Sequence, residues 1–410
     1  MGNRSPEPPA QEGDGSAVQP LDDLTVVDLS RALAGPYCTM MLADLGARVI
    51  KVETPDGGDD TRGWGPPFVN GESAYFMSIN RNKQSVTLNL KHARGRDLLL
   101  RLLGRADVLV ENFRPGAMDR LGLGYAAVHE AVPRLVYCSI SGFGQTGPYH
   151  ERAAYDLIVQ GMGGIMGVTG EPDGAPMRVG VAVADICAGM FAAYAILAAL
   201  RARDRTGRGQ WVDAAMLDGQ VAWMTYMAAN YFATGDNPPR VGSAHTNLVP
   251  YQPFPTRDGF VNVAVGSEGL WQKFCDALAL PLAADPRFAT NAARVAHRQE
   301  LLDLLFPVFR RLPTAEWVTR LLAAGVPAGP IYRINEVMTD PQVLHREMVV
   351  NLEHPRAGRI TVNGVPVKLS ETPGAVRTPP PVLGEHTDEV LRGLGVPPDE
   401  LAALRAEGVL

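Results

Sequence analysis

The stretch Leu24–Val52 reads LTVVDLSRALAGPYCTMMLADLGARVIKV and contains two short apolar segments, Leu24–Leu29 and Arg48–Val52. Both are rich in β-branched residues, which favours strands. Between them lie the turn Ser30–Pro36 and the stretch Tyr37–Gly46, which is predicted to be a helix. A strand, a turn, a helix and a second strand open a parallel sheet. The predicted fold class is therefore α/β.

The same alternation continues toward the C-terminus. Further strands and helices are predicted at Val86–Leu90, Ala93–Gly104, Val108–Glu111, Ala126–Val132, Leu135–Ile140 and Trp211–Ala215. This order predicts a Rossmann-like large domain. The turn after the first strand holds one glycine, Gly35, so a dinucleotide site of the GxGxxG type is disfavoured.

A chain of 410 residues exceeds one ordinary core, so two domains are expected. After about residue 223 a hairpin signal, Arg257-Asp258-Gly259, joins the predicted strands 251–255 and 259–265. Helices are predicted after it, at 270–278, 299–310 and 315–324. We expect a large domain of residues 21–223 and 336–410, and a smaller α+β domain of residues 224–335. Residues 1–20 are rich in proline, glycine and serine and are expected to be a disordered tail, not a signal peptide.

Three local predictions concern the segments around these domains. Tyr155–Met166 and Asp185–Arg203 are each predicted to be one helix. The turn-like pair Asn363-Gly364 predicts a hairpin of strands 358–362 and 365–369. The longest uncharged apolar run, Ile186–Leu200, is shorter than the ~20 residues that span a bilayer, and a buried helix is expected there.

The composition excludes several classes of protein. The net charge is −6, which argues against a broad nucleic-acid-binding surface but not against a local basic pocket for small anions. Four cysteines are widely spaced without a CxxC, and eight histidines form no HxH or HExxH pattern. A disulfide framework and a metal site are therefore not expected. The cytoplasm is the expected compartment.

Asp185 is a carboxylate inside the apolar stretch Gly180–Gly189, at the start of a predicted helix. One interpretation is a helix N-cap, a position at which aspartate is favoured. The other is catalysis, because an apolar environment would partly desolvate the carboxylate and raise its pKa and reactivity. The two interpretations are compatible.

Three further segments carry residue types suited to binding anions, and the first two have a plainer alternative. Gly161–Gly170 could present backbone N–H groups to an oxyanion, or could be a flexible loop. Arg81 and Lys83 could recognise phosphate or an adenine edge, or could belong to a solvated loop. After the strand 108–111, Arg114 and Arg120 could hold phosphates and Phe113 could stack on a base.

In their order and spacing, these motifs resemble the class III CoA-transferases (the CaiB/BaiF family), which include formyl-CoA transferase and carnitine CoA-transferase. The resemblance extends from about Leu21 to the C-terminus. It is carried by residues 33–38, 49–53, 58–62, 82–85, 110–116, 139–144, 155–156, 185, 206–210 and 383–387.

The resemblance implies that Asp185 is the covalent nucleophile, acting through an aspartyl anhydride and an aspartyl-CoA thioester. It implies CoA or acyl-CoA as substrate, no permanently bound cofactor or metal, and an interlocked homodimer. The family's CoA-contacting positions fall on Ala32, Leu33, Leu88, Asn89, Lys91, Asn112, Phe113, Arg114, Arg120, Ala153, Ala154, Tyr155 and Asp156.

Details of the sequence indicate a branch of that family. Ser243–Gln252 replaces the mobile glycine-rich loop of formyl-CoA transferase, which argues against formate or oxalate as substrates. Tyr155-Asp156 stands where related α-methylacyl-CoA racemases have a histidine and an aspartate. Residues 64–68, 137–142, 228–231 and 249–252 resemble the succinyl-CoA–glutarate CoA-transferase branch. The expected reaction is CoA transfer from succinyl-CoA to a short dicarboxylate such as glutarate, and the alternatives are an acyl-CoA racemase or isomerase and a CoA-binding protein without turnover.

Overall fold

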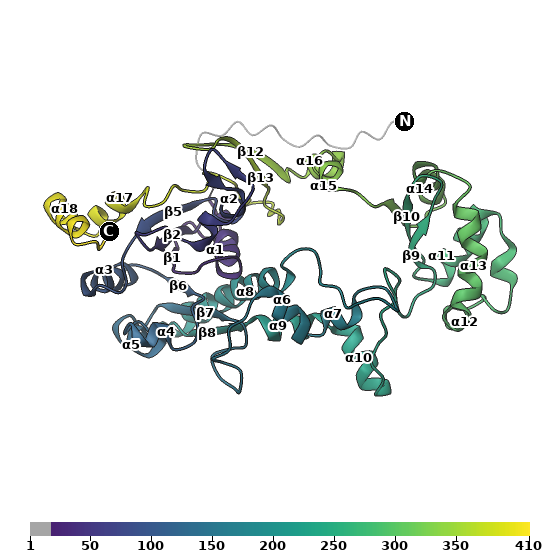
Figure 1. The fold of residues 1–410 in the computed structure, drawn as a ribbon, viewed down its shortest axis with the longest axis horizontal. Coiled ribbons are helices and arrows are strands. Elements are labelled where there is room, and N and C mark those ends of the chain that lie inside the picture. The colour runs from purple at the N-terminus through teal and green to yellow at the C-terminus, as the bar shows by residue number, and fades with distance from the viewer. Residues whose placement is uncertain (1–17) are drawn as a thin grey trace. The chain divides into compact units, whose positions relative to one another are not determined.

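The computed structural model describes residues 18–410, and a six-stranded sheet is its main element (Figure 1). The strand order is β5-β2-β1-β6-β7-β8, and all five neighbouring pairs are parallel. The strands are β1 (Thr25–Asp28), β2 (Arg48–Glu53), β5 (Lys83–Thr87), β6 (Val108–Glu111), β7 (Val136–Ser141) and β8 (Trp211–Ala215). The predicted α/β class is confirmed.

The direction in which strands are added reverses between β1 and β6. Strands β2 and β5 lie on one side of this point and β7 and β8 on the other, which is the order found in dinucleotide-binding folds. In such sheets ligands bind outside the carboxyl ends of the strands at the reversal. The segments that follow β1 and β6, beginning at Leu29 and Asn112, are therefore the first places to look for a site.

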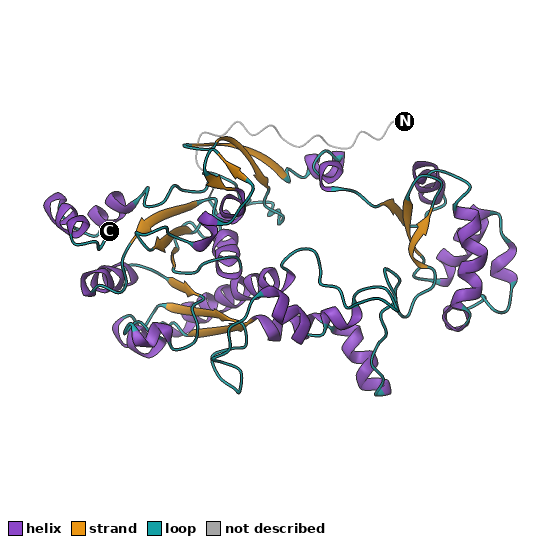
Figure 2. Cartoon of the chain, viewed as in Figure 1, coloured by secondary structure: helices purple, strands orange, loops and turns teal. Residues whose placement is uncertain are grey.

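Helices cover both faces of the sheet (Figures 1 and 2). One face packs against α3 (Ala93–Leu103), α5 (Tyr125–Ala131), α17 (Thr387–Gly393) and α18 (Pro398–Ala406), in a core rich in leucine and valine. On the other side are α1 (Ala34–Asp44) and α8 (Val183–Thr206). A Cβ atom at Gly189 of α8 would lie 2.6 Å from the Ala34 carbonyl oxygen, so this close helix contact requires glycine.

The described chain forms two compact units. The first comprises the residues up to Arg152, Ile186–Ala215 and Glu347–Leu410, and the second comprises Ala153–Asp185 and Met216–Arg346. The predicted large domain, residues 21–223 with 336–410, and the predicted small domain, residues 224–335, have other bounds than these units and stay a prediction. Most of the predicted tail, residues 1–17, lies outside the described residues.

The second unit has its own core around an antiparallel sheet. This sheet has the order β11-β10-β9, with β9 (Tyr251–Pro255), β10 (Phe260–Ala264) and β11 (Ala328–Pro330). The hairpin predicted at Arg257–Gly259 is confirmed. Phe254, Phe274, Phe309 and Trp317 are buried among the helices that follow. These are α11 (Glu268–Leu278), α12 (Asn291–Ala296), α13 (Arg298–Phe309) and α14 (Thr314–Ala323).

The remaining elements are short. They are β3 (Phe68–Val69), β4 (Glu72–Ser73), α2 (Ala74–Ile79), α4 (Ala117–Arg120), α6 (Asp156–Met162), α7 (Ile165–Val168), α9 (Met216–Trp223), α10 (Thr225–Thr234), α15 (Ile334–Val337), α16 (Pro341–His345), β12 (Val349–His354) and β13 (Gly358–Asn363).

Two local predictions are wrong. The segment predicted as one helix over 155–166 forms α6 and α7, separated at Gly163–Gly164, where Gly164 has a φ of +88°. The strand at 358–363 pairs with the preceding segment 349–354, not with 365–369. Gly364 donates its N–H to the Met348 carbonyl, and a Cβ there would lie 1.9 Å from the Glu347 oxygen. The chain therefore leaves the hairpin at Asn363-Gly364 instead of turning within it.

Helix α8 is longer than the apolar run Ile186–Leu200, because it begins at Val183 and the largely charged segment 201–205 continues it to Thr206. At 24 residues it is long and apolar enough to cross a membrane, and it is the only such helix within residues 18–410. A core helix of a soluble protein meets the same criterion, and 56% of its apolar window is buried. One such helix is weak evidence for a membrane span.

Candidate functional site

A cavity of about 740 Å³ lies beside the carboxyl ends of β1, β2, β5 and β6. This is the edge of the sheet at which the strand order predicts a ligand. Its lining residues are Leu29, Arg31, Val52, Glu53, Thr54, Pro55, Asp56, Leu88, Asn89, Leu90, Lys91, Phe113, Leu121 and Gly408. Of the two carboxylates in this lining, Glu53 is already paired with Arg62. The cations Arg31 and Lys91, the aromatic ring and the apolar side chains suit a ligand that is part anionic and part aromatic.

The cavity brings together four of the residues predicted to contact CoA: Leu88, Asn89, Lys91 and Phe113. Ala32, Leu33, Asn112, Arg114 and Arg120 belong to the same unit but do not line it. Arg114 instead lines a second cavity of about 160 Å³. Ala153, Ala154, Tyr155 and Asp156 belong to the other unit.

Arg31 lines the cavity and was not among the predicted site residues. Its backbone is held on both sides by Asn112, whose amide oxygen accepts the Arg31 N–H at 2.8 Å and whose amide nitrogen donates to the Arg31 carbonyl at 2.8 Å. Its guanidinium lies 5.4 Å from the centre of the Phe113 ring. A signal existed in the sequence, because a basic residue two positions after the first strand falls at the expected ligand edge.

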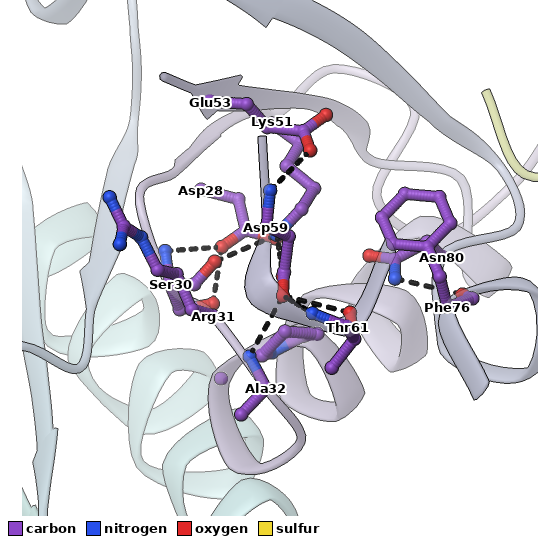
Figure 3. Close-up of polar contacts among 12 residues, drawn as sticks. Asp28, Ser30, Arg31, Ala32, Lys51, Glu53, Asp59, Thr61, Phe76 and Asn80 are labelled. Carbon is purple, nitrogen blue, oxygen red and sulfur yellow. Dashed lines mark hydrogen bonds and ion pairs between the residues drawn. The ribbon is translucent and has the colours of Figure 1, made fainter. Parts of the chain in front are cut away.

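Behind the cavity wall lies a buried charged network (Figure 3). Lys51 forms an ion pair with Asp59 at 2.8 Å, Lys83 forms one with Asp28 at 3.1 Å, and all four side chains are fully buried. The parallel register places Asp28 directly beside Lys51 on the neighbouring strand. The two cations and the two anions balance each other's charge within the core. Burying the cations or the anions without their partners would leave uncompensated charge away from water.

The network changes the interpretation of Arg81 and Lys83. Lys83 also donates to the Pro36 carbonyl and to Asn80, while Arg81 is buried in an ion pair of 2.6 Å with Asp44. Burial would raise the pKa of Asp28, but the charges of Lys83 and Lys51 outweigh it and bring the pKa down to about 2. The structure gives the phosphate-recognition alternative for these two cations no support.

Asp185 is the third residue of α8 and is half-buried, so the predicted N-cap role is wrong. The cap is supplied by Asp156: one of its carboxylate oxygens accepts the Ala184 N–H at 3.0 Å. The other accepts from the Gln160 side-chain amide at 2.8 Å, and Arg178 lies 3.7 Å away. Asp156 therefore fixes the turn of helix that carries Asp185.

The predicted strip of free glycine N–H groups is interrupted. Gly161 lies inside α6, and the Gly163 N–H donates to the Val159 carbonyl at 2.7 Å. A Cβ at Gly163 would lie 2.5 Å from the Gln220 side chain. These two glycines serve helix geometry and close packing, which leaves them unsuited to binding an oxyanion.

The segment Ser243–Gln252 carries a stacked imidazole. His245 packs face to face with Tyr226 at 5.1 Å and against Tyr251 at 5.2 Å. Arg298 donates to the carbonyls of His245 and Thr246. Burial, and then the charge of Arg298, lower the pKa of His245. The segment is thus held by aromatic stacking and hydrogen bonds within the second unit.

Metal binding and cysteine chemistry find no support in the described chain. Within residues 18–410, no group of three or more histidine, cysteine, aspartate or glutamate side chains could hold a metal ion. All four cysteines are buried and outside disulfides. Burial raises the pKa of Cys38 and Cys138, which makes reactive thiolates at these positions unfavourable.

Glu111, the last residue of β6, is a buried acid in the wall of the smaller cavity. Burial raises its pKa to about 7, and Asp119 and Asp213 add to the rise, while hydrogen bonds from Ser139 and the Phe113 N–H oppose it. The pKa of Glu111 in the folded state lies above the ordinary 4.5, so the folded protein favours the protonated acid. Its contribution to the free energy of unfolding is therefore complete below pH 4.5 and is lost as the pH rises through 7.

We expect Glu111→Gln to raise the melting temperature relative to wild type much more at pH 8 than at pH 5, because pH 5 lies only just above the ordinary pKa of 4.5. The amide removes a carboxylate that would otherwise carry an uncompensated charge in the folded state, worth at most about 3 kcal/mol. Thermal unfolding at pH 5, 6.5 and 8 measures this, with the exposed Glu130→Gln on α5 as the control. An equal difference at all three pH values would contradict the raised pKa.

Comparisons with known proteins by sequence and by structure point to one family. The profile of CoA-transferase family III matches residues 21–387. Succinyl-CoA:glutarate CoA-transferase from Mus musculus is 44% identical, with 93% of this chain and 88% of that protein aligned. Succinate–glutarate CoA-transferase from Agrobacterium fabrum is 46% identical over 92% of this chain and 96% of that protein. The crystal structure of a CAIB/BAIF family protein from Brucella suis superposes with a TM-score of 0.82 at 44% identity, covering 92% of this chain and 99% of that one.

Proposed function

The chain belongs to CoA-transferase family III and is a CoA-transferase, and we propose that it moves CoA from succinyl-CoA to glutarate or a similarly short dicarboxylate. The observation that carries the choice of substrates is the identity of 44% and 46% to two enzymes named for that pair, over more than nine-tenths of this chain. The residues at 228–231 and 249–252 that indicated this branch support the same proposal.

The proposed mechanism uses Asp185 as the nucleophile. Its carboxylate attacks the succinyl-CoA carbonyl, and CoA leaves as a thiolate, which gives an aspartyl-succinyl anhydride. The thiolate then attacks the aspartyl carbonyl, which releases succinate and forms an aspartyl-CoA thioester. Glutarate attacks that thioester and expels the thiolate again, and the thiolate takes the glutaryl group from the new anhydride. Each step exchanges one activated acyl bond for another, so one exchange is divided into steps of similar energy.

The cavity beside the sheet is the proposed CoA site. Arg31 and Lys91 supply positive charge for phosphates, and Phe113 offers an aromatic face for the adenine. The remaining predicted contacts, at Ala32, Leu33, Leu88, Asn89, Asn112, Arg114, Arg120 and 153–156, stay part of this proposal.

Mass spectrometry of the products tests the proposal. Purified protein is incubated with succinyl-CoA and one acid at a time from a panel containing glutarate, longer and shorter dicarboxylates, oxalate and formate. Glutaryl-CoA that forms only when glutarate is present supports the proposed pair. Efficient transfer to oxalate or formate but not to glutarate would refute it, and deuterium uptake at the α-carbon without an acceptor would favour the isomerase alternative.

Arg31→Ala is expected to raise KM for acyl-CoA by about tenfold or more, because a guanidinium–phosphate contact is a charge-assisted hydrogen bond. The value of kcat should stay within about threefold, since Arg31 would bind equally in the ground and transition states. Initial rates over a range of succinyl-CoA concentrations measure both, with the exposed Arg105→Ala as the matched control. An unchanged KM in Arg31→Ala would remove Arg31 from the site.

A homodimer is the proposed assembly. Its support is a set of large apolar side chains that are exposed in the single chain, including Phe232 at 79% and Tyr194 at 70%. They occur on α8 (Met190, Phe191, Tyr194, Leu197) and α10 (Tyr226, Tyr231, Phe232). Exposed apolar area of this kind is typical of an interface. Sedimentation at micromolar concentration tests this proposal, and a monomer would refute it.

A further inference from the structure

The turn after β1 has an unusual backbone at a position that was predicted to contact CoA. Ala32 has a φ of +63°, in the left-handed region that disfavours residues with a Cβ. Something in the fold must hold it there, because alanine in isolation would leave this conformation.

A single carboxylate holds this residue. Asp59 Oδ1 accepts the Ala32 N–H at 3.3 Å, together with the Thr61 N–H at 2.9 Å and the Thr61 hydroxyl at 2.8 Å (Figure 3). Its other oxygen, Oδ2, is paired with the Lys51 ammonium at 2.8 Å. Lys51 also donates to the Ser30 carbonyl at 2.7 Å. The ion pair therefore holds the turn at residues 30 and 32.

The loop that carries Asp59 is fixed in turn by β2. Glu53, two residues beyond Lys51, accepts the Asp59 N–H at 3.0 Å and forms two hydrogen bonds with Arg62 at 2.7 and 2.8 Å. The other side of the turn is fixed by Asn112, which binds both backbone groups of Arg31. Arg31 and Glu53 line the cavity, so the restrained turn is part of its wall.

A fully buried ion pair is a poor source of stability, because removing two charges from water costs about as much as their attraction returns. The hydrogen bonds to Ala32 and Ser30 give this pair another role. We propose that Lys51 and Asp59 are positioning residues that hold Ala32, and with it the turn Ser30–Leu33, in the conformation required for binding CoA. This proposal rests on the proposed function in one respect, that CoA binds at this cavity.

The test is the dissociation constant for free CoA, measured by calorimetry. Asp59→Asn is expected to raise it by about tenfold or more, because the Ala32 N–H loses an ionised acceptor. Ala32→Gly in the same variant should restore it to within about threefold of wild type, since glycine adopts a positive φ without steric cost. If Asp59→Asn weakened CoA binding only by destabilising the fold, Ala32→Gly would not restore the dissociation constant.

The control is Asp44→Asn, which breaks the similarly buried ion pair between the last residue of α1 and Arg81, in the segment between α2 and β5. It should lower the melting temperature and leave the CoA dissociation constant unchanged. If Asp59→Asn does not fold, Lys51→Met combined with Asp59→Asn removes both charges and takes its place, with the same rescue by Ala32→Gly.

Wild-type affinity in a folded Asp59 variant, or no recovery on adding Ala32→Gly, would overturn the proposal. Because the measurement uses CoA without turnover, it is separate from the proposed reaction. A wild-type protein that binds CoA but transfers it to no acid would refute the function and leave this test intact.

Discussion

Asp185→Ala is expected to abolish CoA transfer, lowering kcat by at least about 10⁴-fold, while the dissociation constant for CoA stays within about threefold. The loss is large because every proposed covalent intermediate forms on this carboxylate, and removing the nucleophile of a covalent mechanism typically costs this much or more. Binding survives because the cavity that is proposed to hold CoA is built from other residues. Product mass spectrometry and calorimetry measure the two quantities.

The matched control for this variant is Asp204→Ala, which removes an exposed carboxylate from the last turn of the same helix. It should transfer CoA at the wild-type rate. Intact-protein mass spectrometry of wild type after incubation with succinyl-CoA should also show a CoA adduct that Asp185→Ala cannot form. Transfer near the wild-type rate in Asp185→Ala, or an adduct on another residue, would refute the assignment of the nucleophile.

The second large effect is expected at Asp156. Removing the carboxylate that accepts the Ala184 N–H frees the first turn of α8, and with it the side chain of Asp185. A displaced nucleophile costs about 10²-fold when the shift is on the order of 1 Å, so Asp156→Ala should lower kcat by roughly ten- to one-hundredfold. Asp156→Asn keeps an oxygen acceptor and should recover most of that loss.

These variants also distinguish the two roles considered for Asp156. If it positions the helix, kcat falls and the dissociation constant for CoA does not change. If it contacts CoA, as the family resemblance implies, the dissociation constant rises in Asp156→Ala. The exposed Asp173→Ala in the same unit is the control and should change neither value.

The central strands of the sheet contain buried charged residues within a mainly apolar sequence. Strands β1 and β2 have valine or isoleucine at half of their positions, as strands buried on both faces of a parallel sheet often do. Asp28, Lys51 and Glu53 lie in or at the ends of these strands and are nevertheless buried. They gather at the carboxyl edge, where the parallel register sets Asp28 beside Lys51. A charge within an apolar strand is therefore a useful sequence signal for the edge that forms a site.

The sequence by itself determined the features that depend on neighbouring residues. The valine-rich segments and the turn and helix between them predicted the parallel sheet, because strand and helix preferences act over a few residues. The helix begins earlier than predicted, at Ala34, so Gly35 and Pro36 lie in its first turn. The hairpin at Arg257–Gly259 followed from turn chemistry in the same way. The ordered motifs around Leu33, Asn112 and Asp185 were enough to indicate the family that the comparisons then established.

Only the tertiary structure decided what depends on residues distant in the sequence. The pairing of strand 358–363, the cap that Asp156 gives to α8 and the place of Arg31 in the cavity wall each join separate segments. The sequence left Lys83 open between phosphate recognition and a solvated loop, and the fold instead buries it against Asp28. The physical reason is that the burial and the charge partner of a side chain depend on which segments the fold brings together. A local sequence pattern carries no information about the distant segment that will lie beside it.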